Sequence, residues 1–264
     1  MNDGKLRKFA KNAEHEQHFY LRMLRQHFRP GMRWLDAGCG HSLIPQWMQG
    51  ADEIEQKFLA EAQSIVGADV DAQSLSSPSS IRRIACDLEA LAFENETFDF
   101  ITCNMVVEHL AAPMRVFREY FRALRTGGVV IILTPNLYHW ANIVSLLTPF
   151  WFHSWILKKL FNCEPEDVFP TRYRCNTKKA MQKMLRTAGF SSVTVHMIPG
   201  RPRLVDFGPL FYPEYLFYRL SCRFPQLREV LCAVAQKSPA GPGFTVSPKR
   251  TLHDESLLPS AGPR

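Results

Sequence analysis

The chain has 264 residues, 46% of them hydrophobic and 22% charged, which is the composition of a folded globular protein rather than a disordered or fibrous one. Its formal net charge of +7 is compatible with nucleic acid, an anionic membrane surface or an acidic substrate as partner, although its lysines and arginines are scattered along the chain. The chain has seven cysteines but no C-x-x-C pair, and its N-terminus lacks an apolar signal core. No apolar run reaches the roughly 18 residues that a membrane span needs. These features predict a cytoplasmic protein, peripheral to a membrane at most.

The first 70 residues show helical and strand patterns in alternation. Apolar side chains recur at helical spacing up to the stop at Pro30-Gly31, so residues 1–29 are expected to be one N-terminal helix. A glycine-containing turn follows the first apolar strand. The expected elements are, in order, a helix at 3–28, a strand at 32–37, a helix at 43–50 that continues through 51–62, and a strand at 64–70.

The middle of the chain continues the alternation. A helix is expected after Pro113, ended by Thr126-Gly127-Gly128, and the strand after it carries no charge, as a strand buried on both faces should. The strands expected here are residues 81–87, 98–106 and 129–135, and the helix is residues 114–125.

An aromatic, proline-punctuated insertion at 137–176 interrupts this rhythm. It is followed by a helix at 178–188, capped at Asn176-Thr177 and closed by Gly189, and by strands at 191–198 and 228–237. Residues 239–264 are rich in Pro, Gly and Ser and are expected to be a disordered tail.

Short apolar strands alternating with helices predict an α/β fold with a doubly wound, Rossmann-like parallel sheet, which we assign to one domain at 1–238. Ligands of open α/β sheets bind at the carboxyl ends of the strands. Three features fall there in succession. They are the glycine turn Asp36-Ala-Gly38-Cys39-Gly40 after the first strand, Asp69 after the second and Asp87 after the third.

Two cofactors fit this constellation, a dinucleotide and S-adenosylmethionine. The dinucleotide fingerprint needs a third glycine where this chain has Leu43. In that fingerprint the ribose acid follows the glycines by roughly 20 residues, whereas the spacing from Asp36 to Asp69 is longer. An acid directly before the glycines suits a ligand with an ammonium group better than a pyrophosphate. Asp36 and Leu43 therefore both favour S-adenosylmethionine.

At this point the sequence resembles a known family, the class I S-adenosylmethionine-dependent methyltransferases, and among them the ubiquinone-pathway-like small-molecule branch. The similarity is carried by "WLDAGCGHS", "IVGADVD", "ACDLEALAF", "ETFDFITCNMVVEHL" and "VFREYFRALRTGGVVIILTPN". It is close over residues 30–136 and looser over 165–200. It implies a seven-stranded sheet whose last strand is antiparallel. The cofactor-binding residues that it implies are Asp36, Gly38, Cys39, Gly40, Asp69, Val70, Asp87, Leu88 and Asn104.

The family's first motif usually ends in glycine where this chain has Ser42. We expect the turn to stay intact, because a small serine at the start of a helix can cap its free N–H groups.

The candidate base is His109, with Glu108 beside it, because histidine titrates near neutral pH and this pair follows the fourth strand. In the resembling branch an additional acid lies where this chain has Met105, and a thioether is a poor ligand for a hard cation, so no metal is expected. The candidate acceptor-binding residues are His139, Arg172, Tyr173 and Arg174.

The segment 137–161 contains three tryptophans and three phenylalanines and ends near Lys158 and Lys159. It is interpreted as a lid over an apolar acceptor, as an ordinary packed subdomain, or as an interfacial segment that contacts a membrane peripherally.

The sequence therefore predicts an enzyme that transfers the methyl group of S-adenosylmethionine to a small-molecule or lipid-linked acceptor, at oxygen in the first instance, or at nitrogen or carbon. A non-catalytic module that binds the cofactor or a partner is the first alternative. A nucleic-acid methyltransferase is the second, disfavoured because "CNMVVEH" lacks the Pro-Pro-aromatic turn of base-directed enzymes.

Overall fold

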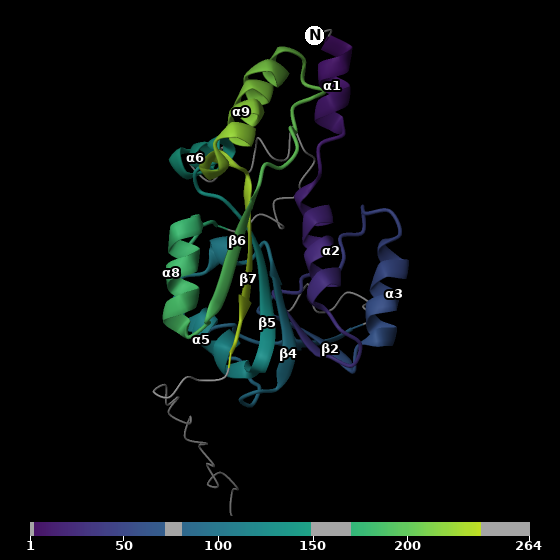
Figure 1. The fold of residues 1–264 in the computed structure, drawn as a ribbon, viewed down its shortest axis with the longest axis vertical. Helices are drawn as coiled ribbons and strands as arrows, with labels where there is room; N and C mark the ends of the chain where they lie inside the picture. The colour runs from purple at the N-terminus through teal and green to yellow at the C-terminus, as the bar shows by residue number, and fades with distance from the viewer. Residues whose placement is uncertain (1–2, 72–80, 149–169, 239–264) are drawn as a thin grey trace, which may run out of the picture.

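A seven-stranded sheet forms the centre of the molecule in the computed structural model, which describes residues 3–71, 81–148 and 170–238 (Figure 1). The strand order is β3-β2-β1-β4-β5-β7-β6, and β7 runs antiparallel to both of its neighbours while the remaining pairs are parallel. The predicted fold class, with its antiparallel last strand, is thus confirmed. The strands are β1 Arg33–Ala37, β2 Ser64–Asp69, β3 Arg82–Ala85, β4 Phe98–Asn104, β5 Leu124–Pro135, β6 Ser192–Ile198 and β7 Val230–Gln236.

Helices cover both faces of this sheet (Figure 1). On one face α5 and α8 pack through a fully buried stripe that includes Phe117, Tyr120 and Leu185, spaced as helical periodicity requires. On the other face α2 and α3 bury Leu24 and Phe58 against the sheet. The helices are α1 Asp3–Lys11, α2 Glu16–His27, α3 Ala51–Glu61, α5 Pro113–Ala123, α6 Trp140–Leu147, α8 Lys178–Ala188 and α9 Phe211–Arg223.

The prediction of a single N-terminal helix over 1–29 is wrong, because the chain breaks between α1 and α2. His15 has an extended backbone, and its Nδ1 accepts a hydrogen bond from the N–H of Gln17, which caps α2. The break lets α2 lie on the sheet while α1 packs beyond it, where Ala10 is buried with Val205 and Phe211. One straight helix could not make both sets of contacts.

The expected helix at 43–50 is also absent, and α3 begins only at Ala51, after Gly50 in the left-handed conformation. Residues 41–50 form successive turns instead. Leu43 and Met48 are both buried in the core, which fixes the turns in place. The proposed role of a helix-capping Ser42 therefore fails, since no helix starts there.

The aromatic insertion is described at its two ends. Its first part contains α6, so a helical insertion after β5 is confirmed for those residues, whereas residues 149–169 lie outside the described part of the chain, as do 72–80 and the tail at 239–264. Among the described residues, no helix is both long and apolar enough to cross a bilayer.

The predicted cap of α8 is present, and it gives a test of the local sequence reading. Thr177→Ala should lower the free energy of unfolding by about 1 kcal/mol, because the Thr177 hydroxyl accepts a hydrogen bond from the N–H of Ala180. Thr177→Ser keeps this hydroxyl and should stay near the wild type in chemical denaturation. Equal stability of the alanine variant and the wild type would contradict this role of the cap.

Candidate functional site

The turn after β1 brings two glycines to the carboxyl end of the sheet for different reasons. Gly38 has φ +75°, and a Cβ on it would overlap the Val106 side chain, so it is glycine because of packing within the protein. Gly40 has φ +48°, but no atom lies within 4 Å of the position of a Cβ. The backbone at Gly40 therefore borders open space that a ligand can approach closely.

Asp36 is buried directly before this turn, and two side chains of the sheet hold it. Thr102 Oγ1 donates a hydrogen bond to Asp36 Oδ1 at 2.7 Å and accepts one from Trp34 Nε1 at 2.6 Å. Burial raises the pKa of the Asp36 carboxyl to about 7, the Thr102 hydrogen bond opposes this rise, and the negative charge of Asp69 adds to it. A cationic ligand group beside Asp36 would favour its ionised form.

Asp69 ends β2 with both carboxylate oxygens bound to backbone. Its Oδ2 accepts from the N–H of Gly40 and its Oδ1 from the N–H of Asp71, each at 3.0 Å. Each oxygen keeps a further lone pair for a ligand hydroxyl, so the carboxylate is oriented in advance for a ribose. The neighbouring Val70 side chain is 70% exposed, which leaves an apolar surface beside this position.

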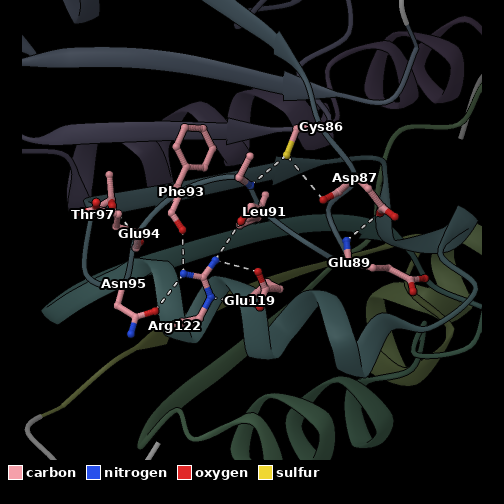
Figure 2. Close-up of polar contacts among 11 residues, drawn as sticks. Cys86, Asp87, Glu89, Leu91, Phe93, Glu94, Asn95, Thr97, Glu119 and Arg122 are labelled. Atoms are coloured by element: carbon pink, nitrogen blue, oxygen red, sulfur yellow. Dashed lines mark hydrogen bonds and ion pairs between the residues drawn. The ribbon is translucent and has the colours of Figure 1, made fainter. Parts of the chain in front are cut away.

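The loop after β3 carries Asp87, which is exposed, and Leu88, which is buried. Asp87 Oδ1 accepts from the N–H of Glu89 at 2.8 Å, which folds the start of the loop into a turn (Figure 2). The N–H of Ala90 closes the same turn on the Asp87 carbonyl at 3.0 Å, so of the N–H groups that follow Asp87 the one left for the expected contact with a ligand is that of Leu88.

Arg122 of α5 holds the rest of this loop (Figure 2). Its guanidinium donates to the carbonyl oxygens of Leu91 and Phe93 at 3.1 and 2.8 Å and to Asn95 Oδ1 at 2.9 Å, and it pairs with Glu119 on its own helix at 2.8 Å. Arg122 thus anchors residues 91–95 of the loop to α5.

Asn104, at the end of β4, faces α2. Its side chain and that of Gln17 exchange two hydrogen bonds, of 3.0 and 3.1 Å. Cys39 is buried, and burial raises the pKa of its thiol to about 12, so it remains a neutral packing group at physiological pH. Gln17 is a site residue that sequence reasoning missed, since nothing in the N-terminal pattern distinguishes it.

These residues fit the S-adenosylmethionine expectation. Asp36 would face an ammonium group, Gly40 would allow the backbone to approach, Asp69 would bind the ribose hydroxyls, and Asp87 with Leu88 would border the adenine. Gly127 also has empty space at its Cβ position, so the observation that supports this fit most directly is the 3.0 Å hydrogen bond from the N–H of Gly40 to Asp69 Oδ2, which joins the glycine turn to the expected ribose acid.

A cavity of about 640 Å³ lies beyond the carboxyl ends of β4 and β5, between α2, α6 and α9. Of the predicted catalytic and acceptor-binding residues, Glu108, His139 and Tyr173 line it, whereas His109, Arg172 and Arg174 do not belong to its lining. Met105 also lines it, with an uncommon positive φ of 55° for a non-glycine residue.

Glu108 is one of four buried carboxylates that line this cavity, and the other three, Glu16, Glu214 and Glu229, lie around Arg203. Burial raises the pKa of Glu108, while His109 and a 2.7 Å hydrogen bond from Thr134 Oγ1 to its Oε2 act in the opposite direction. Asn176 Nδ2 donates to the same Thr134 oxygen at 2.7 Å, so the position of the hydroxyl is fixed. Glu108 Oε1 lies 3.9 Å from His109 Nε2.

The remaining predicted residues lie around Glu108. The Nδ1 of His109 lies 3.1 Å from the carbonyl oxygen of Pro170, which places the ring against the end of the insertion. The N–H groups of Arg172 and Tyr173 both donate to the Glu108 carbonyl, and the side chains of Arg172 and Arg174 are exposed.

His139 is buried in the cavity wall next to α9. Burial and the positive charge of Arg203 lower the pKa of its imidazole to about 4, so it is neutral at physiological pH. Its Nδ1 is buried without a hydrogen-bond partner in the described structure. A neutral imidazole can orient a bound acceptor but is too weak a base to remove a proton from it at neutral pH.

Sequence reasoning missed a charged group at the far end of the cavity. Arg203 contacts Glu229 at 2.6 Å and Glu16 at 3.7 Å, and Glu214 accepts the backbone N–H groups of Arg203 and Leu204. Burial raises the pKa of Glu229 to about 7, against the opposing effect of Arg203. Nothing in the sequence could have identified this group, because its members are isolated charges far apart along the chain.

Within the described ranges, no group of three or more His, Cys, Asp or Glu side chains is arranged to hold a metal ion.

The different environments of the glycines give a matched test. Gly40→Ala should weaken S-adenosylhomocysteine binding at least about tenfold, because its Cβ would occupy the space that the ligand approaches, and the positive φ adds strain on the order of 1 kcal/mol. Gly127 also has a positive φ, of +85°, and empty space at its Cβ position, but it lies far from the site. Gly127→Ala should therefore show the backbone strain without the loss of affinity. Calorimetric titration measures both, and equal affinities of the two variants would contradict the assignment.

Comparison with known proteins agrees with this geometry. A family model described as a methyltransferase domain matches residues 9–195, more than half of the chain. The ubiquinone biosynthesis O-methyltransferase of Parvibaculum lavamentivorans is 35% identical over 105 residues, which cover 40% of this chain and 41% of that protein. The malonyl-[acyl-carrier protein] O-methyltransferase of Erwinia pyrifoliae is 30% identical over 136 residues, which cover 48% of this chain and 47% of that protein. The chain thus matches less than half the length of either relative.

The fold is also similar to that of a solved S-adenosylmethionine-dependent methyltransferase from Mesorhizobium loti. The TM-score is 0.51 at 17% identity, over 81% of this chain and 96% of that one. The glycine turn, the acids at successive strand ends and the match to the family model lead to one conclusion: the chain belongs to the class I S-adenosylmethionine-dependent methyltransferase family.

Proposed function

We propose that the protein transfers the methyl group of S-adenosylmethionine to an oxygen of a small-molecule or lipid-linked acceptor bound in the 640 Å³ cavity. One observation carries the proposal. The segment that follows β4 touches the glycine turn through Val106, against Gly38, and reaches the cavity wall through Glu108 two residues later. A cofactor bound at the glycine turn and an acceptor bound in the cavity would therefore be adjacent, on the two sides of one short segment.

The bound cofactor would supply an electrophilic methyl group, so orientation of the acceptor within the site would account for much of the rate. The chain's own contribution to the chemistry is removal of the acceptor proton. Glu108 is the group we assign to this step, because it lines the cavity and His109 does not. Its Oε2 is held by Thr134, which leaves Oε1 to take the proton of an acceptor hydroxyl. His109, 3.9 Å from Oε1, would orient the carboxylate.

The choice of acceptor class rests on the cavity and on the relatives. Aromatic and aliphatic side chains, among them Trp140, Tyr173 and Phe217, line much of the cavity wall, which suits an acceptor with a large apolar part. The two relatives are named as O-methyltransferases, one of ubiquinone biosynthesis and one of an acyl-carrier-protein-linked substrate. Those names support oxygen as the methylated atom and an acceptor attached to a longer chain.

A transfer assay separates this function from a non-catalytic module. Labelled S-adenosylmethionine is incubated with the protein and with either a lipid extract or a water-soluble extract of the source cells. Label in an alkali-stable lipid product is the expected result. Tight binding of S-adenosylhomocysteine without label transfer to either extract would favour the non-catalytic reading.

The two candidate bases can be told apart with matched variants. Glu108→Gln keeps the shape and the hydrogen bond from Thr134, so it should lower kcat by about 100-fold while leaving S-adenosylhomocysteine affinity unchanged. His109→Gln should lower kcat much less. Because burial raises the pKa of Glu108, the wild-type rate should rise with pH through a value above the usual range of a glutamate. The reverse order of the two variants would reassign the base to His109.

A further inference from the structure

The exposed apolar side chains of this protein are concentrated at one end. Of the twelve large hydrophobic residues that are exposed in the described chain, ten fall within residues 138–147 and 210–224, which contain α6 and α9. Single exposed apolar residues are common, but a contiguous group of them marks an interaction surface. The core of this group, which we call the α6–α9 surface, consists of Val144, Leu146, Leu147, Leu210, Leu216 and Leu220.

The two helices lie next to each other beyond the carboxyl end of the sheet (Figure 1). The ring of His139, which precedes α6, packs edge-on against Phe217 of α9 at 5.2 Å between centroids. Leu147 is 78% exposed and Leu216 63%, so these side chains point away from the core. The outer faces of the two helices thus form one apolar region.

The same region is the rim of the acceptor cavity. Val144 and Leu210 are exposed at the surface and also line the cavity. A long apolar substituent on a bound acceptor would therefore leave the cavity across the α6–α9 surface without crossing a polar barrier at these two residues.

The charges on this surface are of one sign. The α6 segment contains no charged residue, and the exposed charged residues of α9 are Arg219 and Arg223. The only acid of α9, Glu214, is buried and is occupied by the N–H groups of Arg203 and Leu204. On α6 and α9, exposed aliphatic side chains are accompanied by arginines and by no exposed acid, whereas Asp206, an exposed acid, lies in the loop before Leu210. This combination on the two helices matches an anionic lipid surface. A second copy docked through the same two helices would offer no exposed acid of α6 or α9 to these arginines.

We propose that the α6–α9 surface docks on an anionic membrane and directs the cavity mouth toward the lipid, so that the acceptor enters head-first with its lipid chain still in the bilayer. The docking itself stands on the surface alone, whereas the entry of the acceptor rests on the proposed methyl transfer. The protein would act as a peripheral enzyme that leaves its substrate anchored.

Vesicle co-sedimentation of the full chain tests the docking. Phosphatidylcholine vesicles containing phosphatidylglycerol should sediment the protein at low salt, and pure phosphatidylcholine vesicles should sediment it much less. The double variant Leu147→Glu, Leu216→Glu should weaken binding to the anionic vesicles at least about tenfold. The double variant Lys57→Gln, Lys183→Gln changes the net charge by the same two units on exposed residues of α3 and α8, and should bind nearly as the wild type does.

Three results would overturn the docking. The first is that the wild-type protein does not bind anionic vesicles. The second is that both double variants lose binding equally. The third is that light scattering shows a wild-type dimer, which the leucine double variant converts to a monomer. The first would mean that another part of the chain or a protein partner covers the surface. Unchanged affinity for S-adenosylhomocysteine shows that each variant is folded.

The transfer assay is then repeated with the lipid extract in vesicles and in detergent. Loss of transfer only from vesicles in the leucine variant supports the proposal. Vesicle binding without any transfer would leave the docking in place and count against the proposed function. Transfer that is equal in both variants on vesicles would count against the docking and leave the function in place.

Discussion

The buried carboxyl of Asp36 is the group on which the rest of the site depends. Its hydrogen bond from Thr102 joins the end of β1 to β4, and Trp34 completes the same chain of contacts in the core. Burial without a cationic partner raises the pKa of this carboxyl to about 7, so the folded protein loses stability as the pH rises through that value. A cofactor ammonium beside Asp36 would stabilise the ionised carboxyl and so offset this loss of stability. Cofactor binding would thereby be coupled to the contact between β1 and β4.

The segment after β4 connects the glycine turn with the candidate acceptor cavity. It begins at Asn104, which α2 holds through Gln17, passes the glycine turn at Val106 and presents Glu108 to the cavity. Small displacements of this segment would therefore act on the cofactor side and the acceptor side together. The N-terminal break at His15 belongs to the same design, because it frees α1 to reach the α9 region while α2 covers the sheet.

The residues of the candidate cofactor site were predictable from sequence, whereas most of those that line the candidate acceptor cavity were not. Asp36, Asp69 and Asp87 each follow an apolar strand, so parallel topology alone brings them to one edge. Glu16 and Arg203 meet only because α2 and a distant loop converge in three dimensions, and no local pattern records that convergence. The helix expected at 43–50 failed for a related reason, since burial of its apolar side chains in turns outweighed helical periodicity.

Calorimetric titration with S-adenosylhomocysteine at several pH values tests the central claim most directly. If a ligand ammonium lies beside Asp36, affinity should rise with pH up to about pH 7 and level off above it, with net proton release on binding below about pH 7. Asp36→Asn should abolish the proton release and weaken binding, while Asp71→Asn, which changes a half-buried acid two residues after Asp69, should preserve the release. Affinity that is independent of pH in the wild type, or an Asp36→Asn variant that binds as tightly, would contradict the account.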